Sequence, residues 1–405
     1  MKMVRTMNWG ALLLWVMAAN LGVGSTSEAG ETASSLRRVF LQPPALDPGV
    51  NVKTKIVCAR PYREGGPRIG YERIGDQDIY HGYGHGSWGW TGLFGSVDSL
   101  VDYFLQGYDG EHHTSITIIG AGCMAKMTAI KLLSLGYENL TLMAASFTNL
   151  TSHNAGGLLS PSSSIMTSPH LQRICLDTYT QYLQVMAGTH PYFNPSNISA
   201  CVREMAAFFP NREGSDLEFY VSAGLMSPAQ DVIVDFGNGT SHRMVQYRDI
   251  FMGTQPMMAE MDTILRRQNV RLVEKTVTAF TDVGTPVIFN CTGAGARELC
   301  HDDAMRKIFG HLVLLQEQPS AREGSLSLRD YMILGPAREE EKEGYSNWRF
   351  LYYMPKQTVG ADDQVDESQL GVMGGTFLKN TEELLHHPKE FDDVMKEALH
   401  FYGMQ

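Results

Sequence analysis

Two glycines and an alanine stand at the spacing of a phosphate-binding turn. In the string ITIIGAGCMA, Gly120 and Gly122 follow an apolar, strand-like run and precede a helical pattern, with Ala125 in the third position. The first glycine permits a tight turn, and the second lets the backbone approach a pyrophosphate at the helix N-terminus. Because a strand–turn–helix–strand pattern surrounds the string, it predicts dinucleotide binding more strongly than the glycines alone would.

The second strand of this pattern lacks one expected residue. A carboxylate about 20 residues after the glycines usually binds the ribose hydroxyls. Here the strand ends LMAASFT, with Ala145 in that place. Loss of one charge-assisted hydrogen bond costs about 1.5–3 kcal/mol and weakens binding roughly ten- to hundredfold. A cofactor held by many other contacts could survive that loss, whereas a weakly held one could not.

Histidines and cysteines are the other residue types that could do chemistry. Six histidines lack acid or cysteine partners at the spacings of the usual ligand sets, so we predict no metal site. They are His81, His85, His112, His113, His386 and His387. The 6 cysteines are an even number that an oxidising compartment could pair in several ways. Cys123 and Cys291 lie inside apolar motifs, which favours buried free thiols.

The elements that would position these residues follow from hydrophobic periodicity. Helical spacing is found over 92–106, 124–135, 170–187, 254–268 and 390–402. Strand-like runs are found over 115–119, 140–144, 231–236, 270–277, 286–290, 311–316, 331–334, 349–354 and 370–377. The later runs have few helices between them, which favours antiparallel pairing.

Composition sets the size and the surface of the molecule. A chain of 405 residues with 43% hydrophobic content is long enough for two packed domains. The net charge of -11 comes from 33 basic and 44 acidic side chains that are scattered along the sequence. No basic surface is therefore expected, and nucleic acid is not a predicted partner. The oligomeric state is left open.

The first residues differ in kind from the rest. Lys2 and Arg5 precede an apolar run from Trp9 to Val23, which Asn20 interrupts. The run is shorter than the roughly 20 residues of a membrane-spanning helix, so a secretory signal over residues 1–29 is favoured over an anchor. The mature chain is then expected to be secreted or periplasmic and not bound to a membrane. Residues 30–51 are predicted to be a linker, with ordered structure from about residue 53.

Longer strings carry a family resemblance. From residue 116 onward, ITIIGAGCMAKMTA, FTNLTSHNAGGLLSP, VIFNCTGAGA, YYMPKQTVG and GVMGGTF resemble successive segments of the D-amino-acid oxidase family. The family's last segments resemble VCARPYREGGPRIGYE and IYHGYGHGSWGWTGLFGSVDSLVDYFL, which here stand at the front. Moving residues 52–107 behind residue 405 restores the family order, so the chain resembles a circularly permuted member. Domain termini usually lie close together at the surface, which makes permutation physically reasonable.

The resemblance implies an α/β fold of two parts. One is a Rossmann-type FAD-binding domain, formed by residues 52–169 with residues 278–305. The other is a substrate domain with a mostly antiparallel β-sheet, formed by residues 170–277 with residues 306–405.

The resemblance also assigns residues to the substrate. Arg60 matches the family's arginine that pairs with the substrate carboxylate, for which a guanidinium fork is well suited. Tyr352 matches a tyrosine that adds a second carboxylate contact, although a core tyrosine is the alternative. Trp348 falls where the family has a lid tyrosine, and packing is its alternative role. Ser87 replaces a glycine beside the amino-group site.

Further residues match segments around the cofactor. They form the phosphate turn, the segment facing the reactive ring, a strand-end turn and a glycine-rich loop. The predicted FAD-binding residues are Gly120, Ala121, Gly122, Cys123, Met124, Ala125, Thr151, Ser152, Ala155, Gly156, Gly157, Leu158, Thr292, Gly293, Gly84, His85, Gly86, Trp88, Gly89, Trp90 and Thr91.

The function that the resemblance implies is FAD-dependent oxidation of a small D-configured or achiral amino acid. The products would be the 2-oxo acid, ammonia and hydrogen peroxide, and the cofactor rather than an acid–base residue would do the chemistry. Two alternatives stay open. One is a dehydrogenase on the same scaffold with another electron acceptor, and the other is a binding protein that has lost FAD, toward which Ala145, Ser87 and Trp348 point.

Overall fold

The fold is taken from a computed structural model of the chain. It describes residues 36–108, 112–161, 168–198, 201–342, 345–359, 365–366, 371–379 and 388–404. The predicted signal peptide (residues 1–29) and two of the histidines, His386 and His387, lie outside these residues. Within the described ranges, no helix has the length and apolar character needed to span a bilayer.

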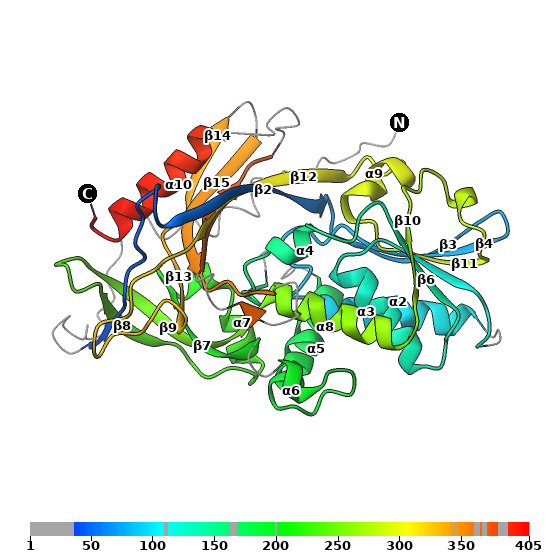
Figure 1. The fold of residues 1–405 in the computed structure, drawn as a ribbon, viewed down its shortest axis with the longest axis horizontal. Helices are drawn as coiled ribbons and strands as arrows, with labels where there is room; N and C mark the ends of the chain where they lie inside the picture. Colours follow the sequence, from blue (N-terminus) through cyan, green and yellow to red (C-terminus); the bar gives the residue numbers. More distant parts are fainter. Residues whose placement is uncertain are drawn as a thin grey trace, which may run out of the picture.

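A six-stranded sheet forms one side of the molecule, at the right of Figure 1. Its strands, in spatial order, are β10 (Arg271–Glu274), β6 (Leu140–Ala144), β5 (Ile116–Ile119), β11 (Val287–Asn290), β4 (Gln77–Tyr83) and β3 (Arg68–Ile74). All neighbours pair in parallel except β3 and β4. The central strands β5 and β11 are buried at every residue. This burial explains their mainly apolar sequences, because a central parallel strand is covered on both faces.

Helices pack against this sheet. They include α2 (Leu93–Gly107) and α3 (Cys123–Ser134), which lie beneath it in Figure 1, and α8 (Thr254–Arg267), which packs on α3. The apolar stripe of α2 is buried, and the helices predicted over 92–106, 124–135 and 254–268 are confirmed to within one residue at each end. An ion pair between the buried Lys126 and Asp262, 2.6 Å apart, ties α3 to α8.

The second sheet has ten strands and forms the other side of the molecule. Nine run in the spatial order β1 (Arg37–Phe40), β8 (Gln230–Asp235), β9 (Ser241–Met252), β7 (Val202–Phe209), β13 (Tyr331–Leu334), β15 (Tyr345–Met354), β18 (Gly371–Phe377), β12 (Met305–Leu315) and β2 (Val52–Arg63), and β14 (Arg338–Lys342) pairs with β15. Pairing is antiparallel except between β1 and β8 and between β7 and β13, so the expected mostly antiparallel sheet is confirmed.

The remaining elements cap the sheets or connect them. Helix α10 (Pro388–Phe401) buries Phe391, Val394 and Ala398 in a cluster with side chains of the ten-stranded sheet. The others are α4 (Thr151–Asn154), α5 (Pro169–Met186), α6 (Pro195–Ile198), α7 (Glu218–Ser222), α9 (Ala296–Leu299), the pair β16 (Thr358–Val359) and β17 (Val365–Asp366), and the short 3-10 turns η2 (Glu213–Ser215), η3 (Phe280–Asp282) and η4 (Gly293–Gly295).

Strand β2 connects the two sheets. It pairs with β12 along its whole length, and a further bridge joins Tyr62, near its end, to His85 just after β4. In Figure 1, β2 and β12 run side by side along the top of the molecule from one sheet toward the other. Residues 52–107 therefore contribute strands to both sheets.

Three expectations about segment boundaries need correction. Ordered structure begins before residue 53, because Arg37–Phe40 pairs with β8 inside the range predicted to be a linker. The two arginines of this strand, β1, are exposed, so its sequence does not show the alternation of apolar and polar residues that indicates a strand. Strand β10 pairs with β6, so it belongs to the six-stranded sheet rather than with the rest of 170–277. Strand β2 belongs to the ten-stranded sheet, although 52–107 was assigned to the FAD-binding part.

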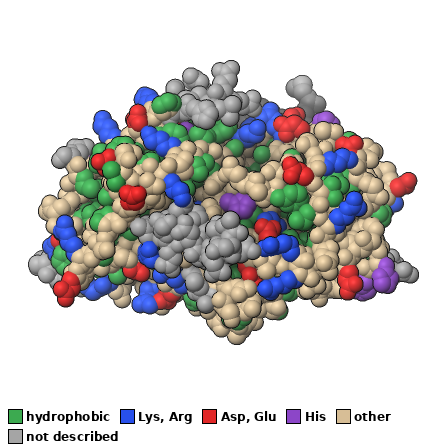
Figure 2. Space-filling view, viewed as in Figure 1, with side chains coloured by type: hydrophobic (Ala, Val, Ile, Leu, Met, Phe, Trp, Pro, Cys, Tyr) green, Lys and Arg blue, Asp and Glu red, His purple; other side chains and the backbone are tan. Residues whose placement is uncertain are grey.

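The structure also bears on the expectations for the cysteines, for a metal site and for the distribution of surface charge. All six cysteines are free, and Cys123 and Cys291 are buried as expected. Among the described residues, no group of three or more histidine, cysteine or acidic side chains could hold a metal ion. Acidic and basic side chains are interspersed over the face drawn in Figure 2.

Candidate functional site

A cleft of about 380 Å³ lies between the two sheets. Three loops reach it from the carboxyl ends of β5, β11 and β4, which are adjacent parallel strands. Strands β2, β15 and β18 of the ten-stranded sheet supply the opposite wall. The volume falls within the 300–1,000 Å³ usual for a ligand pocket. The cleft therefore has the size of a small-molecule binding site.

The turn after β5 brings two strand ends into close contact. Gly120 has φ +122°, and a Cβ there would lie 2.4 Å from the carbonyl oxygen of Cys291, at the end of β11. Gly122 forms the N-cap of α3, and the first turn of that helix, with Cys123 and Met124, lines the cleft. The turn thus presents a helix N-terminus to the cleft, which is the arrangement that binds phosphate groups.

A short helix braces this turn. The Ser152 hydroxyl of α4 accepts a hydrogen bond from the backbone N–H of Cys123 at 3.1 Å, and the Trp90 indole N–H donates to the carbonyl of Ser152 at 3.1 Å. Thr151 donates to the carbonyl of Ala59 in β2 at 3.3 Å. Loops from both sheets therefore meet at the first turn of α3.

Residues 155–158 form a second small-residue segment in the cleft. A Cβ on Gly156 would lie 2.4 Å from the Met354 sulfur, and one on Gly157 would lie 2.1 Å from the Met252 carbonyl oxygen. Both glycines line the cleft. Close packing against β9 and β15 is thus one reason for glycine here, in addition to any approach of a ligand.

A buried lysine fixes the start of this segment. The Lys356 ammonium donates to the carbonyls of His153 (2.6 Å) and Ala155 (2.7 Å) and to the Thr254 hydroxyl (2.6 Å). Burial lowers the pKa of Lys356 to about 7, while the three oxygen atoms around it are acceptors. His153 is occupied as well, because its Nδ1 accepts from the N–H of Leu150.

The loop after β4 is another of the loops that reach the cleft. Gly84 and Gly86 have φ of +88° and +64°, where side chains are strained, and Gly86 packs on the ring of Tyr62. His85 is buried and shares a hydrogen bond of 3.0 Å with Ser96. Burial lowers the pKa of His85 to about 3, so its ring is neutral at physiological pH. This loop therefore contributes the shape of its backbone to the cleft, and no charged side chain.

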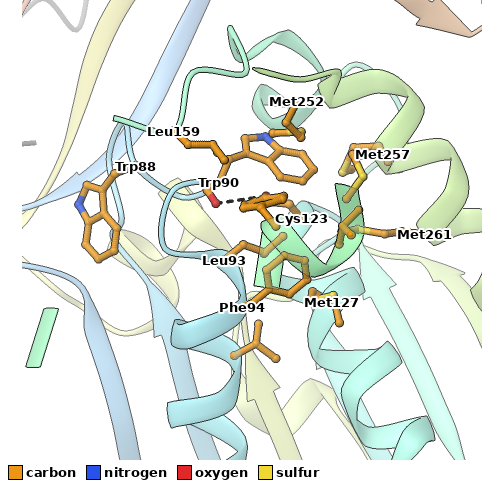
Figure 3. Close-up of a cluster of buried hydrophobic side chains, with 14 of the residues drawn as sticks. Trp88, Trp90, Leu93, Phe94, Cys123, Met127, Leu159, Met252, Met257 and Met261 are labelled. Atoms are coloured by element: carbon orange, nitrogen blue, oxygen red, sulfur yellow. Dashed lines mark hydrogen bonds between the residues drawn. The ribbon is translucent and has the colours of Figure 1, made fainter. Parts of the chain in front are cut away.

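The two tryptophans of this loop point to different places. Trp90 lies among Cys123, Leu159 and Met257 beside the cleft, whereas Trp88 is turned away from that cluster (Figure 3). Trp88 stacks edge-to-face with His85 at a ring distance of 4.9 Å. Of the two, Trp90 is therefore the one placed to contact a ligand.

Arg60 lies on the opposite wall, on β2. Its guanidinium donates to the carbonyl of Thr376 at 3.1 Å and sits 4.0 Å from the centre of the Phe377 ring. A Cβ on Gly310 would come within 2.4 Å of a guanidinium nitrogen, so this glycine makes the room. No described residue forms an ion pair with Arg60. Several N–H donors of a fixed cation therefore remain for an anion in the cleft.

Tyr352 stands beside Arg60. Its side chain is 6% exposed, and burial raises the pKa of its hydroxyl to about 12, while the charge of Arg60 opposes that shift. Gly374 makes space for it, because a Cβ there would lie 2.5 Å from the Tyr352 hydroxyl oxygen. The pair presents a cation and a neutral O–H donor to the same part of the cleft, as recognition of a carboxylate requires.

The structure brings most of the predicted site residues to this cleft. Those that line it are Arg60, Tyr352, Ser87, Gly122, Cys123, Met124, Thr151, Ser152, Ala155, Gly156, Gly157, Leu158, Gly293, Gly84, His85, Gly86, Gly89 and Trp90. Those that it places outside the cleft surface are Gly120, Ala121, Ala125, Trp88, Thr91, Thr292 and Trp348. Trp348 is half-buried on β15, in register with Phe377 but beyond the lining.

Several residues of the site were not predicted. Gly310 and Gly374 make room for side chains from neighbouring strands, and Phe377 stacks on Arg60. Lys356 and Asp216 are charged groups placed by tertiary packing. The LGVMGGTF string held the only usable signal, since paired glycines in a strand indicate close approach.

Comparisons with known proteins place the fold beside distant structures only. No family model matches the sequence, and no curated protein sequence is significantly similar to it. The structure is similar to iminodiacetate oxidase from Chelativorans sp. BNC1, with a TM-score of 0.47, 11% identity, and coverage of 71% of this chain and 79% of that chain. It is also similar to fructosyl amine:oxygen oxidoreductase (Amadoriase I) from Aspergillus fumigatus, with a TM-score of 0.40, 12% identity, and coverage of 66% and 64%.

A third similar structure is fructosamine oxidase (Amadoriase II) from Aspergillus fumigatus, with a TM-score of 0.38, 12% identity, and coverage of 73% of this chain and 88% of that chain. The names of these proteins describe oxidases of amine substrates. The similarity is too low to assign the chain to a family.

Proposed function

We propose that the protein is an FAD-dependent oxidase of a D-configured or achiral amino acid. The observation that carries the proposal is the cleft, in which the Arg60 and Tyr352 pair faces a helix N-terminus and two glycine-bearing loops. A carboxylate-binding pair and a phosphate-binding turn in one cavity suit a reaction between an amino acid and a dinucleotide.

The first turn of α3 and the loops beside it fit the FAD group. Ligands of open α/β sheets bind outside the carboxyl ends of the strands, where the strand order reverses. Here that point lies between β5 and β11, beside Gly122 and Gly293. A side chain at Gly122 would fill the approach, since its Cβ would lie 3.1 Å from the Ser152 hydroxyl. Ala145 supplies no ribose contact, so the first turn of α3 and the loops must hold the nucleotide.

The chain's own residues would bind and orient the substrate. Arg60 and Tyr352 would hold the carboxylate, which selects amino acids over simple amines. Phe350, Met354 and Phe377 would keep water from the reacting carbon, because all three line the cleft with apolar surface. Bound FAD would supply the redox chemistry by accepting a hydride from that carbon. Hydrolysis of the released imine would then give the 2-oxo acid and ammonia.

We also propose that the chain is circularly permuted. The five parallel strands can be numbered from β5, through β6, β10 and β11, with β4 counted last. Their spatial order is then 3-2-1-4-5, as in a doubly wound sheet. In this chain β4 comes first. Met404 and Val52 pack against the same apolar cluster, and Tyr108 hydrogen-bonds Thr114 across the connection between α2 and β5. The connection between α2 and β5 is thus short, and the two ends that the original order would join pack on one apolar cluster.

The function is tested with purified mature protein loaded with FAD. We expect a yellow protein whose flavin absorbance survives gel filtration, and hydrogen peroxide in the presence of D-amino acids but not of the corresponding simple amines. Reduction of an artificial dye without peroxide would favour a dehydrogenase on the same scaffold. A folded, colourless protein that binds no flavin would overturn the proposal and favour a binding protein.

The permutation is tested by rearranging the gene. A chain that begins at residue 112, continues to residue 405 and is joined by a short linker to residues 36–108 should fold with the same flavin content and thermal midpoint within a few degrees. A matched control breaks the chain inside β12, between residues 310 and 311. Loss of folding in both rearranged chains alike would contradict the proposal.

A further inference from the structure

The cleft contains a second charged side chain that the proposed reaction does not use. Among the described residues that line it, Arg60 and Asp216 are the only two that carry a charge at neutral pH. No described residue forms a hydrogen bond or an ion pair with the Asp216 carboxylate. Burial raises the pKa of Asp216 to about 6, and no charged neighbour contributes to the shift. The carboxylate is therefore still mainly ionised at neutral pH and lacks a counter-charge.

The backbone holds Asp216 in a defined position. The residue follows η2 with φ 56° and ψ 3°, a left-handed conformation that aspartate tolerates better than most residues. Its neighbour Ser215 accepts a hydrogen bond from Ser160 at its carbonyl (2.7 Å) and from the N–H of Leu217 at its hydroxyl (3.1 Å). The loop is thus fastened on both sides of Asp216. A desolvated charge without a partner costs free energy. Such unpaired buried charges are found mainly at binding and catalytic sites.

A row of cleft residues leads from Arg60 to Asp216. It crosses four consecutive strands of the ten-stranded sheet, β18, β15, β13 and β7, through Phe377, Phe350, Leu334 and Phe209. The guanidinium of Arg60 lies over β18, and the Asp216 loop follows β7. With a strand spacing of 4.7–4.9 Å, β18 and β7 are roughly 14 Å apart, so a ligand that joins the two charged groups must be long. Apolar side chains lie along the whole span.

We propose that Asp216 selects amino acids with a long cationic side chain, such as D-lysine or D-arginine. This inference rests on the proposed oxidase function. The α-carboxylate pairs with Arg60, the methylene groups lie on Phe350 and Leu334, and the terminal cation pairs with Asp216. A site built for a charged group rejects the uncharged analogue of similar length, because the buried partner is then left unpaired. Short substrates such as D-alanine cannot reach across the span.

The first experiment compares D-lysine with D-norleucine, which has a side chain of similar length without the ammonium group. The wild-type protein is expected to have a kcat/KM for D-lysine roughly ten- to hundredfold above that for D-norleucine. Asp216→Asn should abolish that preference while leaving activity on D-norleucine within a few-fold. The matched control is Glu213→Gln, which removes an exposed acid three residues away. An equal loss with both substrates in Asp216→Asn would overturn the inference and indicate a role in the reaction itself.

The second experiment separates this inference from the oxidase proposal. 6-Aminohexanoate carries a carboxylate and a terminal ammonium but no α-amine, and hexanoate is its uncharged-tail analogue. Calorimetric titration of the full-length protein should show tighter binding of 6-aminohexanoate, with the difference lost in Asp216→Asn and kept in Glu213→Gln. This result without any peroxide production would refute the oxidase and keep the binding role of Asp216. Equal affinity for the two probes, or binding of neither, would overturn the inference even in an active enzyme.

Discussion

The two walls of the cleft are built on different principles. The wall on the six-stranded sheet presents mainly backbone, in turns whose glycines are required by neighbouring main chain, such as Gly120 against Cys291. The wall on the ten-stranded sheet presents side chains, above all Arg60 and Tyr352, in spaces left by Gly310 and Gly374. A backbone wall changes little with sequence, whereas a side-chain wall can change its ligand through single substitutions. The difference predicts that mutations will damage folding on one wall and recognition on the other.

The largest effect is expected from adding one methyl group to the backbone wall, which tests whether that wall depends on close packing of the main chain. Gly120→Ala meets both a left-handed φ and a backbone oxygen 2.4 Å away. We expect a loss of about 3 kcal/mol or more in stability, together with loss of bound flavin. Gly224→Ala is the matched control, because its φ of +73° is strained but no atom lies within 4 Å. Equal falls in the thermal midpoint of the two variants would show that the close approach is unimportant.

On the side-chain wall, the largest expected effect comes from Arg60→Lys. Lysine keeps the charge but cannot offer the planar fork, so KM for the amino acid should rise roughly a hundredfold with flavin content unchanged. Arg306→Lys on the adjacent strand, outside the cleft, serves as the control. Steady-state peroxide kinetics measure the effect. A rise of less than about threefold would mean that the carboxylate binds elsewhere.

Nucleotide binding by the backbone wall can be tested by adding the missing ribose-binding carboxylate. Ala145 is exposed directly after β6, in the place where a ribose-binding acid is expected. Ala145→Glu should tighten FAD binding roughly ten- to hundredfold, because one charge-assisted hydrogen bond is gained. Ala145→Gln is the neutral control. Fluorescence titration of apoprotein with FAD gives the affinities, and identical values for both variants would argue against a ribose at this position.

The smallest expected effect is that of Tyr352→Phe. It removes one O–H donor from the carboxylate site and leaves the ring in its packed position. We expect KM to rise about fivefold, since a single neutral hydrogen bond contributes about 1 kcal/mol. The exposed Tyr103→Phe on α2 provides a comparison variant. An unchanged KM would favour the purely structural role of a core tyrosine.

The sequence predicted the backbone wall better than the side-chain wall, for a physical reason. Gly120, Gly122 and the strands around them form a local pattern, in which the turn and the helix start lie within a few residues. Asp216 and Lys356 gave no such signal, because their positions depend on strands far apart in the sequence. Trp88 and Trp90 are two residues apart and were predicted together as FAD-binding residues. Only Trp90 lines the cleft, because the packing of the loop turns Trp88 away from it. Exposed β1 was missed because two of its four residues are arginines.

The order of the strands has a consequence for synthesis. Strand β4 leaves the ribosome early, but its parallel partner β11 follows about two hundred residues later, and β2 waits still longer for β12. Such distant pairings fold slowly, and unpaired strand edges are prone to aggregate in the meantime. A nascent chain of this protein must therefore keep its first strands from aggregating until nearly four fifths of the polypeptide has been made.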